Sequence, residues 1–89
     1  MGFSVRIAAR PAASRAFTVL LARNLYDASG KLAWYFVRVA TSKLSAFERQ
    51  LAQGKVDMTM FGEVLSSGYG DSPPAHVTER MCKIYGYQG

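Results

Sequence analysis

The chain has little of the chemistry that metal sites and disulfides require, because its 89 residues include one cysteine and one histidine. Cys82 has no partner for an internal disulfide, so we expect a protein of a reducing compartment, the cytoplasm. His76 and Cys82 fall on one expected helix at a spacing that turns them about 120° away from each other. They cannot form a catalytic dyad, and they are too few to supply the ligands of a zinc site. The sequence therefore predicts neither a metal nor a cofactor.

No hydrophobic run is long enough to cross a membrane. The longest one is Ala16–Ala22, which Arg15 and Arg23 bound on either side, whereas a membrane-spanning helix needs about 20 apolar residues. Apolar residues make up 49% of the chain and charged residues 19%, which is typical of a folded globular protein. At this length we expect a single domain over residues 1–89.

Acidic residues are absent from the first 26 positions, which contain four arginines. The rest of the chain has seven basic and six acidic residues, so this first stretch carries +4 of the net charge of +5. Arginine and alanine without acids are also typical of a mitochondrial targeting segment. Apolar residues alternate with others between Phe3 and Ala9, however, which favours a strand that ends before Pro11. We expect residues 1–15 to be a peripheral strand or a basic arm, with a targeting segment as the alternative.

Residues 16–40 are expected to form a β-hairpin. Asp27–Lys31 (DASGK) has the composition of a turn, with an aspartate for a side-chain-to-backbone hydrogen bond and a glycine for positive φ. Leu32–Ala40 (LAWYFVRVA) is rich in aromatic and β-branched residues, which favours a strand. Ala16–Tyr26 alone fits either a strand or a helix, and the turn and strand that follow it favour the strand.

After residue 40 the apolar residues follow a helical period. The pattern predicts three helices within residues 41–86: one that Gly54 ends, a second over Asp57–Ser67, and a third that begins after Pro73–Pro74. The predicted order of elements is βββααα. We therefore expect an α+β fold in which three C-terminal helices cover one face of a small three-stranded antiparallel sheet.

The strand predicted at Leu32–Ala40 is largely apolar on both faces, and helices on one side would leave the other uncovered. The face with Trp34, Phe36 and Arg38 is then a candidate binding surface, unless Trp34 packs beneath the amino-terminal segment. Tyr69 lies between two glycines and is a candidate aromatic anchor. These residues predict a non-enzymatic domain that binds a protein partner or a second copy of itself.

A nucleic-acid-binding module is the first alternative, because rings that stack on bases beside cations that contact phosphates are typical of such proteins. The candidate residues for this function are Arg6, Arg10, Arg15, Arg23, Lys31 and Tyr35. A second alternative is a small accessory or inhibitor protein of a mobile element, which rests only on size and on the lack of catalytic chemistry. An enzyme is the least expected class, because the sequence has no recognisable nucleophile–base or metal constellation.

Overall fold

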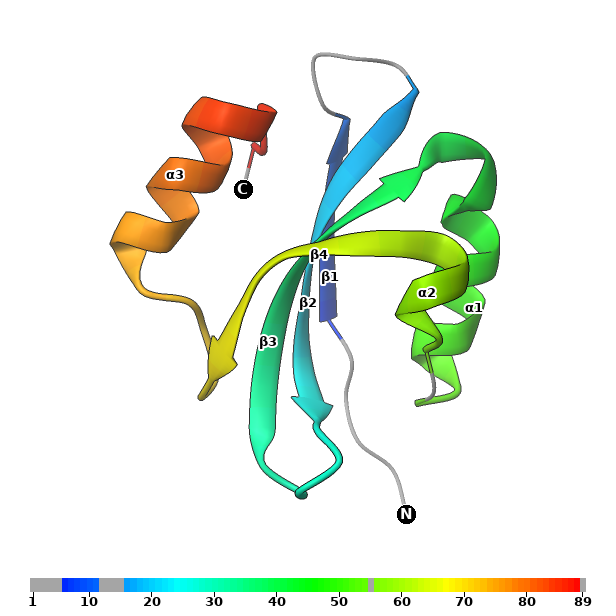
Figure 1. Ribbon diagram of the computed structural model, residues 1–89, viewed down its shortest axis with the longest axis vertical. Helices are drawn as coiled ribbons and strands as arrows, with labels where there is room; N and C mark the ends of the chain where they lie inside the picture. The colour runs from blue at the N-terminus through cyan, green and yellow to red at the C-terminus, as the bar shows by residue number, and fades with distance from the viewer. Residues whose placement is uncertain (1–5, 12–15, 55, 89) are drawn as a thin grey trace.

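The computed structural model describes residues 6–11, 16–54 and 56–88. Four strands form one antiparallel sheet in the order β1-β2-β3-β4 (Figure 1). The strands are β1 (Arg6–Pro11), β2 (Phe17–Tyr26), β3 (Leu32–Ala40) and β4 (Gly62–Tyr69). The helices are the 3-10 helix η1 (Thr41–Lys43), α1 (Leu44–Ala52), α2 (Met58–Phe61) and α3 (Ala75–Tyr85). The α+β class is therefore confirmed. Within the described ranges, no helix has the length and apolar character that crossing a membrane requires.

The hairpin of β2 and β3 depends on Asp27. Its carboxylate accepts hydrogen bonds from the backbone N–H groups of Ser29 at 2.9 Å and of Lys31 at 3.0 Å. Gly30 has a φ of +82°, which glycine adopts without steric cost. The turn forms as the sequence predicts, and β2 is a strand and not a helix.

β1 pairs with β2 and forms one edge of the sheet. The sequence predicts a strand over Phe3–Ala9 that ends before Pro11; residues 6–9 of this range do lie in β1, but β1 continues and includes Pro11 as its last residue. A proline is tolerated there because an edge strand has a free side that needs no N–H donor. Residues 1–5 and 12–15 lie outside the described residues.

The second predicted helix is largely wrong. Asp57 does start a helix, since its carboxylate accepts a hydrogen bond from the Thr59 N–H at 3.1 Å, but α2 ends at Phe61. The chain then continues as β4, paired with β3. Residues of low helix propensity occupy half of the eight β4 positions: Gly62, Ser66, Ser67 and Gly68. Pairing satisfies the backbone groups at the edge of β3, and this gain outweighs the helical spacing of the apolar residues. The order βββααα therefore becomes βββααβα.

Helices cover both faces of the sheet. In Figure 1, α3 lies on one side and α1 with α2 on the other. On the α3 side, Val77 and Met81 join a buried cluster with strand residues. On the opposite side, Phe47 and Leu51 of α1 pack on residues of β2 and β3. β3 is apolar on both faces because each face meets a helix. The prediction that three helices cover one face of a three-stranded sheet is therefore wrong.

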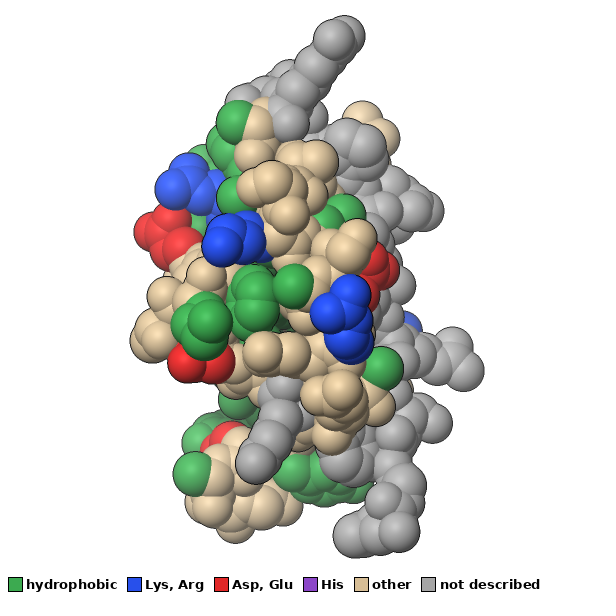
Figure 2. All heavy atoms as spheres, turned by 90° about the vertical axis from the view of Figure 1, so that its right-hand side faces the viewer, with side chains coloured by type: hydrophobic (Ala, Val, Ile, Leu, Met, Phe, Trp, Pro, Cys, Tyr) green, Lys and Arg blue, Asp and Glu red, His purple; other side chains and the backbone are tan. Residues whose placement is uncertain are grey.

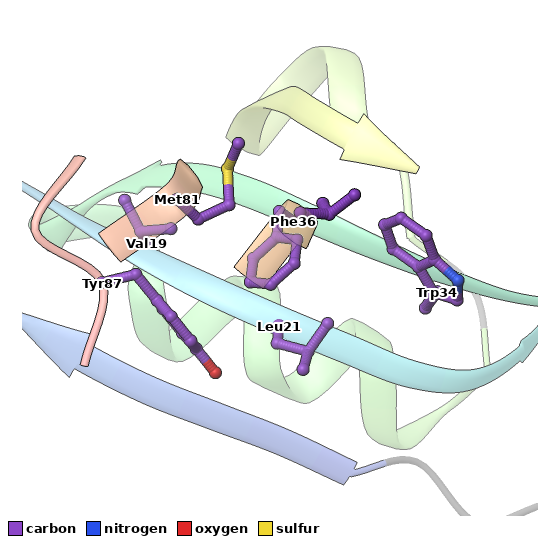
Figure 3. Packing of buried hydrophobic residues seen from close by; sticks show 7 residues of the cluster. Val19, Leu21, Trp34, Phe36, Met81 and Tyr87 are labelled. Carbon is purple, nitrogen blue, oxygen red and sulfur yellow. The ribbon is translucent and has the colours of Figure 1, made fainter. Parts of the chain in front are cut away.

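Trp34 and Phe36 belong to the buried cluster on the α3 side of the sheet and are only 3% and 0% exposed (Figure 3). Their rings meet edge to face with centroids 6.1 Å apart, and Phe36 meets Tyr87 in the same way at 5.1 Å. Tyr87 reaches this position because α3 ends at Gly86 in the left-handed conformation, which reverses the chain. The prediction that Trp34 and Phe36 form an exposed face is therefore wrong.

Candidate interaction surface along the edge strand

Three of the large hydrophobic side chains that are exposed in the described part of the chain lie on α2 and β4. They are Met60, Val64 and Tyr69, and we call them the β4 edge patch. β4 is an edge strand, with β3 on one side only. In Figure 1 it crosses the front of the molecule between α3 and the α1–α2 pair. The patch therefore follows one border of the sheet, which the helices on the two faces do not cover.

Tyr69 is 63% exposed, yet its ring is held by two contacts from the β2–β3 turn. The Nζ of Lys31 lies 5.2 Å from the ring centroid, within cation–π range. The Tyr69 hydroxyl donates a hydrogen bond to the Asp27 carboxylate, and this bond together with the negative charge raises the pKa of Tyr69. The turn and the last residue of β4 thus form one structural unit.

Asp27 is the centre of that unit. The Ser29 hydroxyl donates to its carboxylate at 2.6 Å, and the Lys31 N–H donates at 3.0 Å. These two hydrogen bonds, with smaller contributions from Tyr69 and the Ser29 backbone, lower the pKa of Asp27 from 3.8 to about 2. Asp27 is therefore negatively charged at neutral pH and remains an acceptor for the Tyr69 hydroxyl.

Two shallow hollows share Tyr35, and Tyr69 lines the first of them. The first, of about 180 Å³, is lined by Asp27, Ala33, Tyr35, Ser67, Gly68 and Tyr69. The second, of about 190 Å³, is lined by Leu25, Tyr26, Tyr35 and Val56. Both are smaller than the about 300 Å³ at which small-molecule pockets usually begin. They suit single side chains of a protein partner better than a cofactor.

The opposite end of β4 carries an ion pair. Arg38 lies opposite Glu63 in the β3–β4 register, and their side chains meet at 2.9 Å. The Arg38 guanidinium also lies 4.8 Å from the centroid of the Phe17 ring. A hollow of about 380 Å³ at this end is lined by Ala16, Phe17, Arg38, Ala40, Gly62 and Glu63. Arg38 is exposed here, beyond the part of the sheet that α3 covers.

The structure separates the four residues that the sequence grouped as a partner-binding surface. Trp34 and Phe36 are in the core, whereas Arg38 and Tyr69 are exposed near opposite ends of β4. Met60 and Val64 were not among the candidates, because they fall within the helix that the sequence predicts over Asp57–Ser67. The one signal that pointed to this edge is Tyr69 itself, a bulky aromatic between two glycines.

The candidate nucleic-acid residues that the structure describes are spread over β1, β2, the β2–β3 turn and β3. Arg15 lies outside the described residues, and the backbone of β1 places Arg6 opposite Arg23 at the far edge of the sheet from β4. Arg10 follows on β1 opposite Val19. These positions lie apart from Lys31 at the β2–β3 turn and from Tyr35, which is half-buried on β3.

Arg23 already has a hydrogen-bond partner within the chain, and the face with α1 and α2 carries charges of both signs. The Arg23 Nη1 donates to the Ser72 Oγ at 3.0 Å, so the loop before α3 already contacts this guanidinium. On the face with α1 and α2, Figure 2 shows charged side chains of both signs interspersed with polar and hydrophobic ones. Nucleic-acid binding stays a prediction.

Other site chemistry is sparse. Among the residues whose positions are described, no three or more His, Cys, Asp or Glu side chains come together as metal ligands could. Cys82 is exposed on α3 with a free thiol. The β4 edge and the contacts that hold Tyr69 therefore remain the best-formed candidate site.

No family model matches the chain, and neither the curated proteins nor the solved structures include a match to it.

Proposed function

We propose that this chain is a small non-enzymatic protein-interaction domain that binds along the outer edge of β4, with Tyr69 as its anchor. The observation that carries the proposal is the exposed Tyr69 ring, held in place by Asp27 and Lys31. The protein-binding function expected from the sequence is retained, but its surface moves from the covered face of β3 to the edge of β4.

A held aromatic ring is suited to binding because its conformational entropy is already reduced. Association loses free energy to every side chain that becomes immobile at an interface. Tyr69 would lose little conformational entropy on binding, since its contacts with Asp27 and Lys31 already restrain the ring. Tyrosines of this kind contribute strongly at interfaces because the ring buries apolar area while the hydroxyl keeps a polar partner.

The backbone of β4 adds a second mode of recognition. An edge strand presents N–H and C=O groups that can pair with an extended segment of another chain. Natural edges often carry lysines or prolines that prevent such pairing. β4 has neither, and its single charged residue, Glu63, already pairs with Arg38. A β-bulge at Leu65 limits the registers in which another strand can pair with β4.

The proposal can be tested with the full chain and a displayed library of random peptides, at a protein concentration where the chain is monomeric. We expect selection of extended, apolar peptides whose affinity falls about tenfold or more in Tyr69→Ala. Ile84→Ala is the matched control, since Ile84 is 61% exposed but lies on α3.

Circular dichroism of both variants would show that the fold is kept. Selected peptides that bind Tyr69→Ala as well as the unchanged chain would contradict the proposal, and so would a library from which nothing is selected.

A further inference from the structure

We propose that the partner at this edge is a second copy of the chain, whose β4 pairs antiparallel with the first β4 about a twofold axis at Leu65 and Ser66. The two four-stranded sheets would then join into one sheet of eight strands. This inference rests on the proposed function and names the occupant of the same edge. Its supports are the backbone orientation, the side-chain register and the charges of β4.

The backbone of β4 has its free groups at positions that suit this pairing. The Gly70 N–H donates to the Leu32 carbonyl at 3.0 Å, so the backbone groups of Gly70 point toward β3. Backbone groups alternate in direction along an antiparallel strand. Those of Tyr69, Ser67 and Val64 therefore point away from β3, toward the open edge.

The bulge makes the edge symmetric. The register between β3 and β4 shifts after Phe36, which pairs with Ser66, while Val37 pairs with Val64. Leu65 is thus an extra residue in β4. In a regular strand Val64 and Ser67, three positions apart, would direct their backbone groups to opposite sides. Because of the extra residue, both direct them toward the open edge. With it, Val64 of one copy can form a mutually hydrogen-bonded pair with Ser67 of the other, and the twofold axis repeats this pair.

The same register uses the whole length of β4 and covers the β4 edge patch. It places Tyr69 opposite Gly62 of the other copy, where no side chain obstructs the ring. An aromatic residue opposite a strand glycine is a favourable cross-strand pair. Met60 precedes this glycine and is exposed, so the Tyr69 ring has an apolar neighbour there. Val64, also exposed, comes to lie beside Ser67.

Charge supports a second copy as the occupant. Glu63 is the only charged residue on β4, and this register places it opposite Gly68 and away from its own symmetry mate. Glu63 keeps Arg38 of its own copy as its ion-pair partner. The pairing of the two β4 strands therefore brings no like charges of these strands together, although the whole chain carries +5.

The first test is sedimentation equilibrium over a range of concentrations. We expect a monomer–dimer equilibrium, with a dissociation constant about tenfold or more higher in Tyr69→Ala and unchanged in Ile84→Ala. A chain that stays monomeric throughout would overturn the inference. If such a chain still selects peptides that need Tyr69, the proposed function stands and only its occupant is wrong.

The second test determines the register by disulfide formation in a Cys82→Ser background. Residues directly opposite in an antiparallel pair have Cα atoms about 4.5–5.5 Å apart, a separation that a disulfide can bridge. A mixture of Val64→Cys and Ser67→Cys chains should form a cross-linked dimer on mild oxidation, whereas neither variant alone should.

Cross-linking of Val64→Cys alone, or of Ser67→Cys alone, would indicate a shifted β4 pairing and would overturn the register. A dimer that forms without any of these cross-links, and is unchanged in Tyr69→Ala, would show that the copies meet elsewhere.

Discussion

Gly68 lies directly beneath the indole of Trp34: a Cβ atom at position 68 would sit 2.4 Å from Trp34 Cζ2. The two residues are opposite each other in the β3–β4 register. A glycine is needed here for close packing, because the large ring uses the space that a side chain of β4 would occupy. This contact joins the edge strand to the buried cluster beneath α3.

We expect Gly68→Ala to lower the free energy of unfolding by about 1–3 kcal/mol, because the added methyl group overpacks a rigid contact. Ser67→Ala, at the neighbouring exposed position, should change it by about 0.5 kcal/mol or less. Urea denaturation followed by tryptophan fluorescence measures both. Equal stability of the two variants would mean that the indole can move away without cost.

Trp34 has a buried Nε1 for which the described residues provide no hydrogen-bond acceptor. An unsatisfied donor of this kind lowers stability, and a phenyl ring in its place removes it. We therefore expect Trp34→Phe to cost less than about 2 kcal/mol, against about 3–5 kcal/mol for Trp34→Ala. Thermal and urea denaturation of the two variants provide the comparison. Similar losses in both would show that the indole nitrogen has a stabilising role.

The contribution of Asp27 to stability should depend on pH in the acidic range. Its pKa is about 2 in the folded chain against an ordinary 3.8, so the folded state binds this proton less readily than the unfolded state. The stabilisation is complete above about pH 4 and is lost as the pH falls toward about 2. The stability difference between the unchanged chain and Asp27→Asn should shrink over that interval. A stability difference that stays constant between about pH 5 and about pH 2 would contradict the low pKa of Asp27.

Tyr69 should ionise at higher pH than a free tyrosine, because its hydroxyl donates to Asp27 and its phenolate would face that carboxylate. Replacing Asp27 by Asn removes the charge, so the pKa of Tyr69 should fall toward its ordinary value of 10.0. Carbon NMR of the labelled tyrosine rings over an alkaline titration resolves the residue. An unchanged Tyr69 titration would mean that the ring is not held as described.

Much of the hairpin could be predicted because its determinants are local. Asp27 and Gly30 specify the turn through their own backbone preferences, and the aromatic and β-branched residues of β3 favour a strand in almost any context. The sequence predicts that Gly54 ends the first helix; α1 does end at Ala52, and Gly54 has a φ of +79°, in the left-handed region. Tyr69 could be selected as a candidate anchor from its neighbours in the sequence, whereas its contacts with Asp27 and Lys31 could not be predicted.

What the sequence by itself determined is therefore the α+β class, the β2–β3 hairpin and the end of α1 before Gly54. The tertiary structure alone decided that Gly62–Tyr69 is a strand, because its helical spacing is outweighed by pairing with β3, a partner distant in sequence. It also decided that α3 crosses to the other face and buries Trp34 and Phe36. A regular spacing of apolar residues indicates that one side of a segment is buried. Which other element packs on that side depends on the packing of the whole domain. β4 has an exposed edge because it pairs with β3 on one side only and because α3 packs on a face of the sheet.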